Sequence, residues 1–186
     1  MAAPAPPRKV FVTGANGFIG RVLVERLRAL GSEVSGVDLR QGDDPAVVQG
    51  DMSAPGLWQR HAEGSNVVVH TAALVGMYSS ARGYWESNVM APRLALDAAI
   101  AAGAGRFVHL SSIVVFGFDF DGEVDERTPV HPNGVHYVDT KIASLEAQVT
   151  SDVQQLAKLD AEVLVGQHFA LLRFLPSVPR AMAFLM

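Results

Sequence analysis

The sequence predicts one α/β domain in which a parallel β-sheet carries helices on both faces. Short apolar runs rich in β-branched residues alternate along the chain with segments of helical periodicity, which is typical of such a sheet. The first of these runs leads through a glycine-rich turn into the first helical segment. The chain has 186 residues and is 49% hydrophobic, which suits one domain with a sizeable core.

Six apolar runs are the expected strands, because each is short and bounded by turn residues. They span residues 9–14, 33–38, 46–51, 66–72, 106–112 and 162–176. Helices are expected between them, where apolar residues recur at intervals of three and four. They cover residues 18–30, 57–64 and 83–102, and a segment that contains Tyr137 and Lys141. Pro92 interrupts the third pattern and either lies in a first turn or kinks the helix.

The domain is expected to cover residues 9–175. A disordered leader, rich in Ala and Pro, is predicted for residues 1–8, and an apolar tail of uncertain structure for residues 176–186. Residues 117–135 are acidic and punctuated by Pro and Gly, so we expect a long loop with a function of its own.

Composition excludes several classes of protein. The formal charge of -4 and the absence of a Lys/Arg cluster argue against a nucleic-acid partner, which basic residues would have to bind. There is no cysteine, so neither a disulfide framework nor a thiolate metal site is expected. The sequence contains no run of about 18 apolar residues, so no membrane span is predicted. The leader lacks the apolar segment of a signal peptide. We therefore expect a soluble protein of the cytoplasm without a membrane partner.

Three glycines stand at the junction of the first strand and the first helix. Gly14, Gly17 and Gly20 have the spacing G-x-x-G-x-x-G. Glycine allows a tight turn, close approach of a pyrophosphate to the backbone, and close packing of the helix on the sheet, while the amides of the helix start attract the anion. A purely structural turn is the alternative for a glycine triplet taken alone. The strand before it and the helix after it favour a dinucleotide site.

Asp38 ends the second expected strand, eighteen positions after Gly20. A carboxylate there can accept hydrogen bonds from both hydroxyls of an adenosine ribose. The same carboxylate should repel a 2'-phosphate, so it favours NAD over NADP as the cofactor. Arg40 weakens this preference, because a nearby arginine can accommodate that phosphate.

Tyr137 and Lys141 are four residues apart and therefore share one face of a helix. This spacing also arises by coincidence, so it needs support from other motifs. Six segments supply it: TGANGFIG, GDM, VVVHTAA, SNV, FVHLSSIVVFG and YVDTK. In this order they resemble the extended short-chain dehydrogenase/reductase family, in particular its NAD-dependent epimerase/dehydratase branch. Two segments are also similar to the 3β-hydroxysteroid dehydrogenase branch. The resemblance implies a Rossmann-like, doubly wound sheet.

The resemblance also implies which residues bind the cofactor, through the glycine turn and the ends of the next three strands. They are Gly14, Gly17, Phe18, Ile19 and Gly20 at the pyrophosphate, Asp38 at the ribose, Asp51 and Met52 at the adenine, Thr71, Ala72 and Ala73 beneath the cofactor's ribose, and Tyr137 and Lys141. The catalytic residues that it implies are Ser112, Tyr137, Lys141 and Asn88.

These residue types suit the oxidation of an alcohol. A free tyrosine has a pKa of about 10 and is a poor base at neutral pH. Lys141 and a positive nicotinamide ring would both favour the phenolate of Tyr137, and Ser112 would orient the substrate oxygen. The alternatives are structural: Ser112 as a cap at a strand end, Asn88 as a helix cap, and Tyr137 packing through its ring.

No metal site is predicted. The histidines lack metal-ligand spacing, and His70 and His109 fall within apolar strands, where a satisfied core histidine is the preferred interpretation. The acidic loop lacks the fixed spacing of a calcium site, so it is interpreted as solvated surface. Its carboxylates are Asp119, Asp121, Asp125 and Glu126.

The resemblance implies an NAD-dependent oxidoreductase, epimerase or dehydratase that acts on a secondary alcohol of a small-molecule substrate, either a nucleotide sugar or a sterol-like ring. Family members continue into a smaller C-terminal region that forms most of the substrate pocket, and the chain is expected to lack most of it. The alternative function is a truncated dinucleotide-binding module with little or no turnover. A homodimer is expected by resemblance only, with Leu94 and Leu145 either at its interface or facing the sheet.

Overall fold

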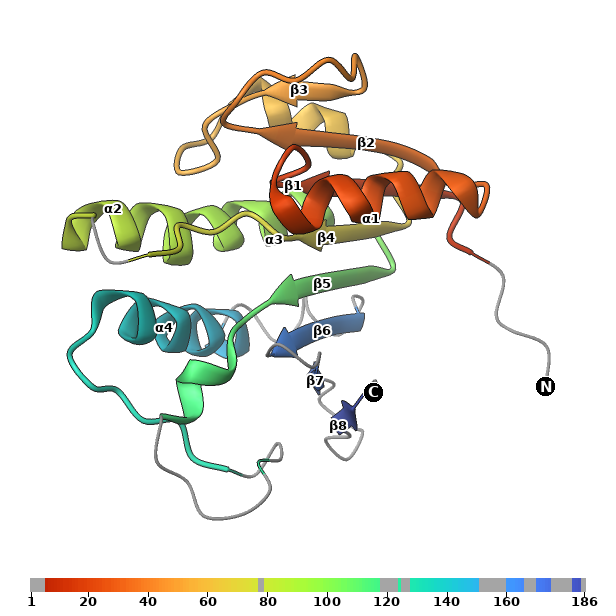
Figure 1. Cartoon of the computed structure of the whole chain (residues 1–186). Coiled ribbons are helices and arrows are strands. Elements are labelled where there is room, and N and C mark those ends of the chain that lie inside the picture. Colours follow the sequence, from red (N-terminus) through yellow and green to blue (C-terminus); the bar gives the residue numbers. More distant parts are fainter. Residues whose placement is uncertain are drawn as a thin grey trace.

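The sheet has the strand order of a doubly wound α/β domain (Figure 1). The computed structural model describes residues 6–76, 79–117, 124, 128–150, 160–165, 170–174 and 182–184. Within these residues the strands are hydrogen-bonded in the order β3-β2-β1-β4-β5-β6-β7-β8. Every pair from β3 to β6 is parallel, so the strand order reverses between β1 and β4. The predicted Rossmann-like fold class is confirmed.

The parallel strands follow the apolar runs closely. They are β1 (Lys9–Thr13), β2 (Glu33–Asp38), β3 (Val47–Gln49), β4 (Val67–His70), β5 (Arg106–Leu110) and β6 (Asp160–Val165). The single strand predicted for residues 162–176 is wrong, because β6 and the antiparallel β7 (Ala170–Phe174) share that run. Residues 166–169 link these two strands, and so short a link joins antiparallel strands but not parallel ones. β8 (Met182–Phe184) pairs antiparallel with β7 and lies in the predicted tail.

The helix predicted over residues 83–102 is divided into three parts. They are α2 (Ala81–Trp85), the π-helical turn η2 (Glu86–Met90) and α3 (Ala91–Ala101). Pro92 is the second residue of α3, but the backbone before it is already helical through α2 and η2, so the proline directly follows a π-helical turn and does not stand at a free helix start. The remaining helices are α1 (Phe18–Ala29), the 3-10 helices η1 (Leu57–Ala62) and η3 (Ile113–Phe116), and α4 (His136–Thr150).

Alternate residues of each strand face opposite layers of helices. Val10 and Val12 of β1 belong to the cluster that contains Val24 of α1. Phe11, between them, belongs to a second cluster that contains Leu96 of α3. The sheet is therefore buried on both faces, as its continuous apolar strands predicted.

Leu94 and Leu145, the candidates for a dimer contact, pack within the chain. Leu94 of α3 packs against the cluster around Phe11, and Leu145 of α4 is buried in a third cluster with Val138 and Ile142. Leu94 thus packs toward the sheet, whereas, among the described residues, the cluster of Leu145 contains residues of α4 and η3 and none of a strand.

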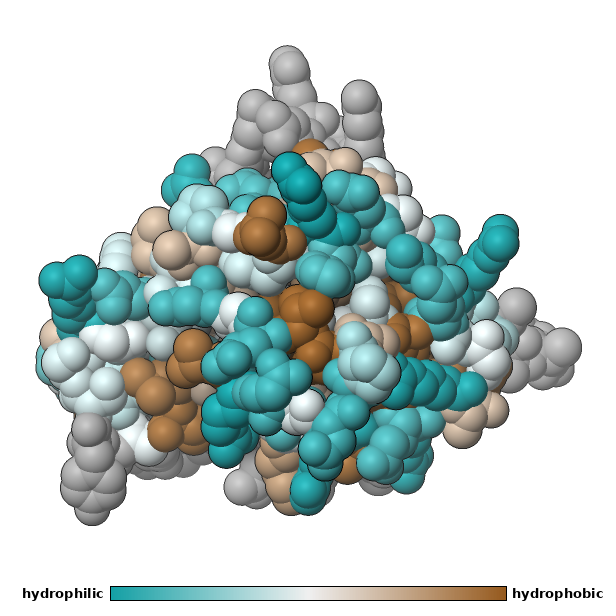
Figure 2. Space-filling view, turned by 90° about the horizontal axis from the view of Figure 1, so that it is seen from above, coloured by the Kyte–Doolittle hydropathy of each residue, from teal (hydrophilic) through white to brown (hydrophobic). Residues whose placement is uncertain are grey.

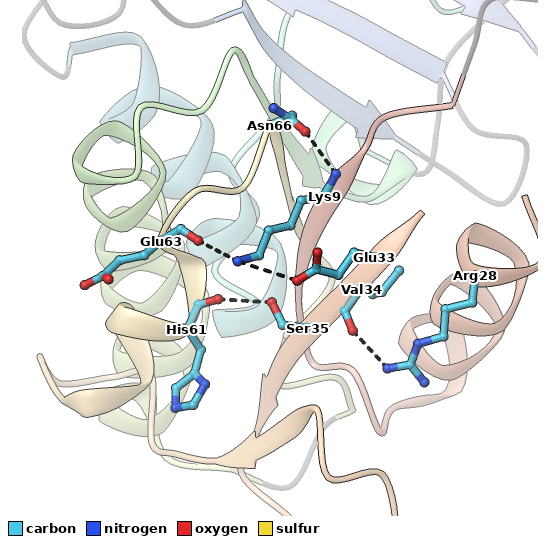
Figure 3. A network of polar contacts seen from close by, with 8 residues as sticks. All are labelled: Lys9, Arg28, Glu33, Val34, Ser35, His61, Glu63 and Asn66. Carbon is cyan, nitrogen blue, oxygen red and sulfur yellow. Dashed lines mark hydrogen bonds and ion pairs between the residues drawn. The ribbon is translucent and has the colours of Figure 1, made fainter. Parts of the chain in front are cut away.

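Polar contacts fasten the amino ends of the strands (Figure 3). The backbone amide of Lys9 donates to Oδ1 of Asn66 at 2.9 Å, and its Nζ donates to the carbonyl of Glu63 at 2.8 Å. The hydroxyl of Ser35 donates to the carbonyl of His61 at 3.0 Å, which joins β2 to η1. These contacts lie at the opposite end of the sheet from the glycine turn, so they stabilise the fold without taking part in the site.

The surface is mixed in polarity. Figure 2 shows one face on which hydrophilic residues predominate and apolar residues stand between them in small groups. Within the described part of the chain, no helix is long and apolar enough to cross a membrane. Of the predicted leader, residues 1–5 lie outside the described residues, while the carbonyl of Pro7 accepts a hydrogen bond from the Ser32 hydroxyl at 2.6 Å. The extent of the leader stays a prediction.

Candidate dinucleotide and catalytic site

The turn between β1 and α1 is packed so closely that only glycine fits at two of its positions. Gly14 has a φ of +66°, and a Cβ added there would lie 2.8 Å from the backbone of Ala72. A Cβ added at Gly20 would lie 2.0 Å from the carbonyl oxygen of Gly14. The amide of Gly17 donates to that same carbonyl at 2.9 Å, which closes the turn. Glycine at these two positions therefore lets the turn pack directly against the segment after β4 and lets α1 pack against the turn.

The amino end of α1 offers backbone donors to an anion. Gly17 is the N-cap and supplies no side-chain cap, and the first turn contains no acidic residue. The amides of Phe18 and Ile19 begin the helix, and both residues are exposed. Amides in the first turn of a helix have no partner within it and attract phosphate groups.

The carboxylate of Asp38 is held against this turn. It is 7% exposed at the end of β2. Its Oδ2 accepts from the amide of Asn16 at 3.0 Å, and its Oδ1 accepts from the amide of Arg40 at 2.9 Å. The side chain of Asn16 in turn donates to the carbonyl of Arg40 at 2.8 Å. Each carboxylate oxygen retains capacity for a further hydrogen bond, so Asp38 can still accept from ribose hydroxyls.

Thr71 and Ala72 close the opposite side of the turn. The hydroxyl of Thr71 donates to the carbonyl of Thr13 at 2.7 Å, and Ala72 packs against Gly14 as described. Ala73, the next residue, is exposed. This segment thus lies where the strand order reverses, which is the usual ligand crevice of such sheets.

Asp51 and Met52 follow β3 next to the end of β2, where the amide of Gly50 donates to the carbonyl of Asp38 at 2.9 Å. Oδ1 of Asp51 accepts from the amide of Ser53 at 2.9 Å and from its hydroxyl at 2.7 Å. These hydrogen bonds lower the pKa of Asp51 below its ordinary value. The side chain of Met52 is buried in the core beside Trp58. Their predicted contact with adenine stays a prediction.

Lys141 reaches the carboxyl end of β5 from α4. It is 2% exposed, and its Nζ donates to the carbonyl of Leu110 at 3.1 Å. Burial lowers the pKa of Lys141 to about 8. Ser112 follows two residues after Leu110 and precedes η3 without making a side-chain cap, and Tyr137 stands half-buried one turn before Lys141. The strand end and the helix thus bring Ser112 and Lys141 into one region.

Asn88 joins the loop after β4 to α4. Its Oδ1 accepts from the amide of Leu74 at 2.8 Å, and its Nδ2 donates to the carbonyl of Leu74 at 3.1 Å and to the hydroxyl of Thr140 at 3.3 Å. It lies in the π-helical turn, a feature that often accompanies functional sites. Both amide hydrogens are used, so this geometry gives Asn88 a structural task beside the site.

Two buried histidines are the feature that the sequence described least well. His70 and His109 occupy paired positions on β4 and β5 and stack with ring centroids 5.3 Å apart. Burial and the charge of Lys141 lower the pKa of His70 to about 3, and burial, Lys141 and His70 hold the pKa of His109 well below its ordinary value. His70 is the last residue of β4 and His109 is the next to last residue of β5, and that placement was the available signal.

Mild acid is expected to destabilise the fold through this pair. Below pH 6.5 the two histidines are protonated in the unfolded chain but stay neutral in the folded chain. The free energy of unfolding is therefore highest above pH 6.5 and decreases toward pH 3. Between pH 6.5 and 5 each histidine should remove about 2 kcal/mol from the free energy of unfolding. Denaturant unfolding at the two pH values measures this, and His109→Gln should lose about half as much. Equal stability of the wild type at both values would contradict it.

The acidic loop predicted as solvated surface lies mostly outside the described residues, and so do all four of its named carboxylates. Among the residues that are described, no group of three or more His, Asp or Glu side chains is arranged to hold a metal ion.

Comparison with known proteins identifies the family. Residues 10–164 match the NAD dependent epimerase/dehydratase family. The chain belongs to this family. The predicted family, and NAD as the cofactor of that family, are thereby confirmed.

Relatives that catalyse different reactions are similar to this chain over most of its length. The chain is 28% identical over 143 residues to 2-alkyl-3-oxoalkanoate reductase of Shewanella oneidensis, and the aligned region covers 73% of this chain and 37% of the reductase. It is 33% identical over 144 residues to dTDP-glucose 4,6-dehydratase of Streptomyces antibioticus, with 67% and 43% covered. The solved structure of MoeE5 in complex with UDP-glucose and NAD superposes with a TM-score of 0.72 at 31% identity, covering 84% of this chain and 53% of that one. The chain spans less than half the length of both curated relatives.

Proposed function

We propose that the chain binds NAD at the carboxyl ends of the parallel strands and uses it to act on a secondary alcohol. The observation that supports this best is the cradle formed by Gly14, Gly20 and Asp38. Its glycines let the turn close tightly in front of the exposed start of α1, whose amides would receive a pyrophosphate, and its carboxylate accepts a hydrogen bond from the amide of Asn16 on the same turn. The residues present therefore fit the cofactor of the family.

The proposed chemistry divides between cofactor and chain. When bound, NAD supplies a nicotinamide ring that accepts and returns hydride. Tyr137 would take the proton from the substrate hydroxyl, and Ser112 would donate a hydrogen bond to the same oxygen. Lys141, which is still mostly protonated at neutral pH, would favour the phenolate of Tyr137 by its positive charge.

Asp38→Ala is expected to weaken NAD binding at least tenfold. The change removes two acceptors for ribose hydroxyls and releases the amides of Asn16 and Arg40, and hydrogen bonds to a charged group contribute about 1.5–3 kcal/mol each. NADP should lose less affinity, because its phosphate no longer meets a carboxylate. Calorimetric titration with both cofactors measures this, with the exposed Asp97→Ala as control. An equal loss for both cofactors would contradict the preference for NAD.

The substrate class proposed is a nucleotide sugar or a sterol-like alcohol. UDP-glucose and dTDP-glucose are the sugar probes, and a 3β-hydroxysteroid is the ring probe. Conversion would be followed by nicotinamide absorbance and by NMR of the substrate, with Tyr137→Phe as the inactive control. Conversion that persists in Tyr137→Phe would overturn the assigned base. NAD binding without conversion of any probe would instead favour the dinucleotide-binding module.

A homodimer through α2, α3 and α4 is part of the proposal and rests on the resemblance to the family. Trp85 of α2 and Met90 of η2 are exposed apolar residues that such an interface would cover, since Leu94 and Leu145 pack inward. Sedimentation velocity distinguishes a dimer from a monomer. The cytoplasmic location stays a prediction.

A further inference from the structure

A strip of buried polar side chains runs across the sheet just below the site. Thr13 of β1 pairs in register with His70 of β4, and His70 pairs with His109 of β5. Ser144 of α4 lies over His109. All four side chains are 1% exposed or less, although the layer beneath them is apolar.

The contacts along this strip are continuous. The hydroxyl of Thr13 and Nδ1 of His70 are 2.8 Å apart, and the rings of His70 and His109 stack at an angle of 17°. Nε2 of His109 and the hydroxyl of Ser144 are 3.3 Å apart. The strip therefore connects the strand that enters the glycine turn to the helix that carries Lys141.

Apolar side chains would stabilise this layer more than the histidines do. Among the described residues, Nε2 of His70 and Nδ1 of His109 have no hydrogen-bond partner. A buried polar atom without a partner costs about 1–3 kcal/mol. Departures from the most stable choice are expected at functional positions, so the pair has a task other than stabilisation.

That task follows from the side chains of α4 that meet β5. Lys141 and Ser144 are three residues apart and share one face of the helix. They bond to consecutive residues of β5, since Lys141 donates to the carbonyl of Leu110 and Ser144 meets the ring of His109. Two contacts at consecutive positions along β5 fix both the rotation of α4 about its axis and its position along the strand.

We propose that His109 and Ser144 are positioning residues that hold α4 on β5 so that Lys141 and Tyr137 stand beside Ser112. His70 and Thr13 extend the same support to the strand that precedes the glycine turn. This inference rests on the roles proposed above for Lys141, Tyr137 and Ser112. It assigns the histidines no contact with substrate or cofactor.

The imidazoles suit this task because they stay neutral. A charged ring would be buried next to the ammonium group of Lys141, and burial of a second cation there is strongly unfavourable. The pair thus provides ring nitrogens and stacking area without adding a charge at the site.

NMR titration of the Lys141 side chain tests the proposal without a substrate. Lysine labelled with ¹³C at Cε reports Lys9, Lys141 and Lys158, and a Lys141→Arg variant assigns the signal. His109→Phe keeps the ring volume and removes the nitrogen, Ser144→Ala removes the hydroxyl, and His109→Gln restores a nitrogen near Nε2. Ser65→Ala is the control, because Ser65 is a buried serine away from the strip.

We expect His109→Phe and Ser144→Ala to raise the titration midpoint of Lys141 by about half a unit or more, because a loosened α4 admits water to the amine. Both should also weaken NAD binding several-fold, while His109→Gln and Ser65→Ala should match the wild type. An unchanged Lys141 midpoint in Ser144→Ala would overturn the proposal even if His109→Phe fails to fold. A wild type that does not bind NAD would overturn the proposed function, and the Lys141 midpoints would still decide the positioning role.

Discussion

Gly20→Ala is expected to destabilise the turn between β1 and α1 and to abolish measurable NAD binding. The added methyl group would lie 2.0 Å from the carbonyl oxygen of Gly14 and 2.9 Å from Cα of Ala15. Both are backbone atoms, so no side chain can move aside and the turn itself must open. An opened turn loses the arrangement of backbone that would receive the pyrophosphate.

Two opposing effects decide the sign of this prediction. Alanine is favoured over glycine inside a helix by about 0.5–1 kcal/mol, so propensity alone would make Gly20→Ala stabilising. Forcing a methyl group into a filled space costs about 1–3 kcal/mol or more. The clash here is with backbone at far less than van der Waals distance, so the steric cost should exceed the gain.

Gly105→Ala is the matched control. A Cβ at Gly105 would come no closer than 3.8 Å to another atom, and the residue has no positive φ. Denaturant unfolding and NAD titration of both variants measure the difference. A Gly20→Ala protein as stable as the wild type and equally able to bind NAD would show that the turn is not the rigid cradle described above.

Lys141→Met is expected to raise stability at pH 7 and to abolish turnover. Methionine keeps much of the buried volume and removes a charge whose burial is unfavourable. With a folded pKa of about 8 against 10.5 in the unfolded chain, the charge costs the fold about 3 kcal/mol at neutral pH. The lost hydrogen bond to Leu110 offsets about 1 kcal/mol of this gain. The net expectation is a gain of about 2 kcal/mol.

The pH dependence provides an independent check on Lys141. A lowered pKa in the folded state means that the unfolded chain holds more protons between pH 8 and 10.5, so wild-type stability should rise across that window. Lys141→Met should lack this rise, whereas Lys9→Met, at a partly exposed lysine, should retain it. A Lys141→Met protein that is less stable than the wild type at pH 7 would mean that the hydrogen bond to Leu110 outweighs the cost of the buried charge.

The sequence predicted the parts of the fold that local pattern determines. β-branched runs predicted the parallel strands, and the glycine spacing with Asp38 predicted the turn that now shows its close backbone contacts. It did not predict the π-helical turn before Pro92 or the division between β6 and β7, because both depend on how neighbouring elements pack. The periodicity of apolar residues cannot by itself predict a π-helical turn or the point at which one apolar run divides into two strands.

The candidate site divides in the same way. Lys141 was predicted as part of a motif, whereas its contact with the carbonyl of Leu110 depends on how α4 meets β5. His70 and His109 were interpreted as satisfied core histidines, but each leaves one ring nitrogen without a partner among the described residues. Their stacking depends on the register of two strands that are far apart in sequence, and single-sequence patterns carry no such information.

Calorimetric titration of the 186-residue chain with NAD tests the central claim most directly. Circular dichroism would first establish that the chain is folded. The account predicts saturable binding of NAD to one site per chain, with weaker binding of NADP. A folded chain that binds no NAD would contradict it, because the cradle at Gly14, Gly20 and Asp38 would then be a structural turn alone.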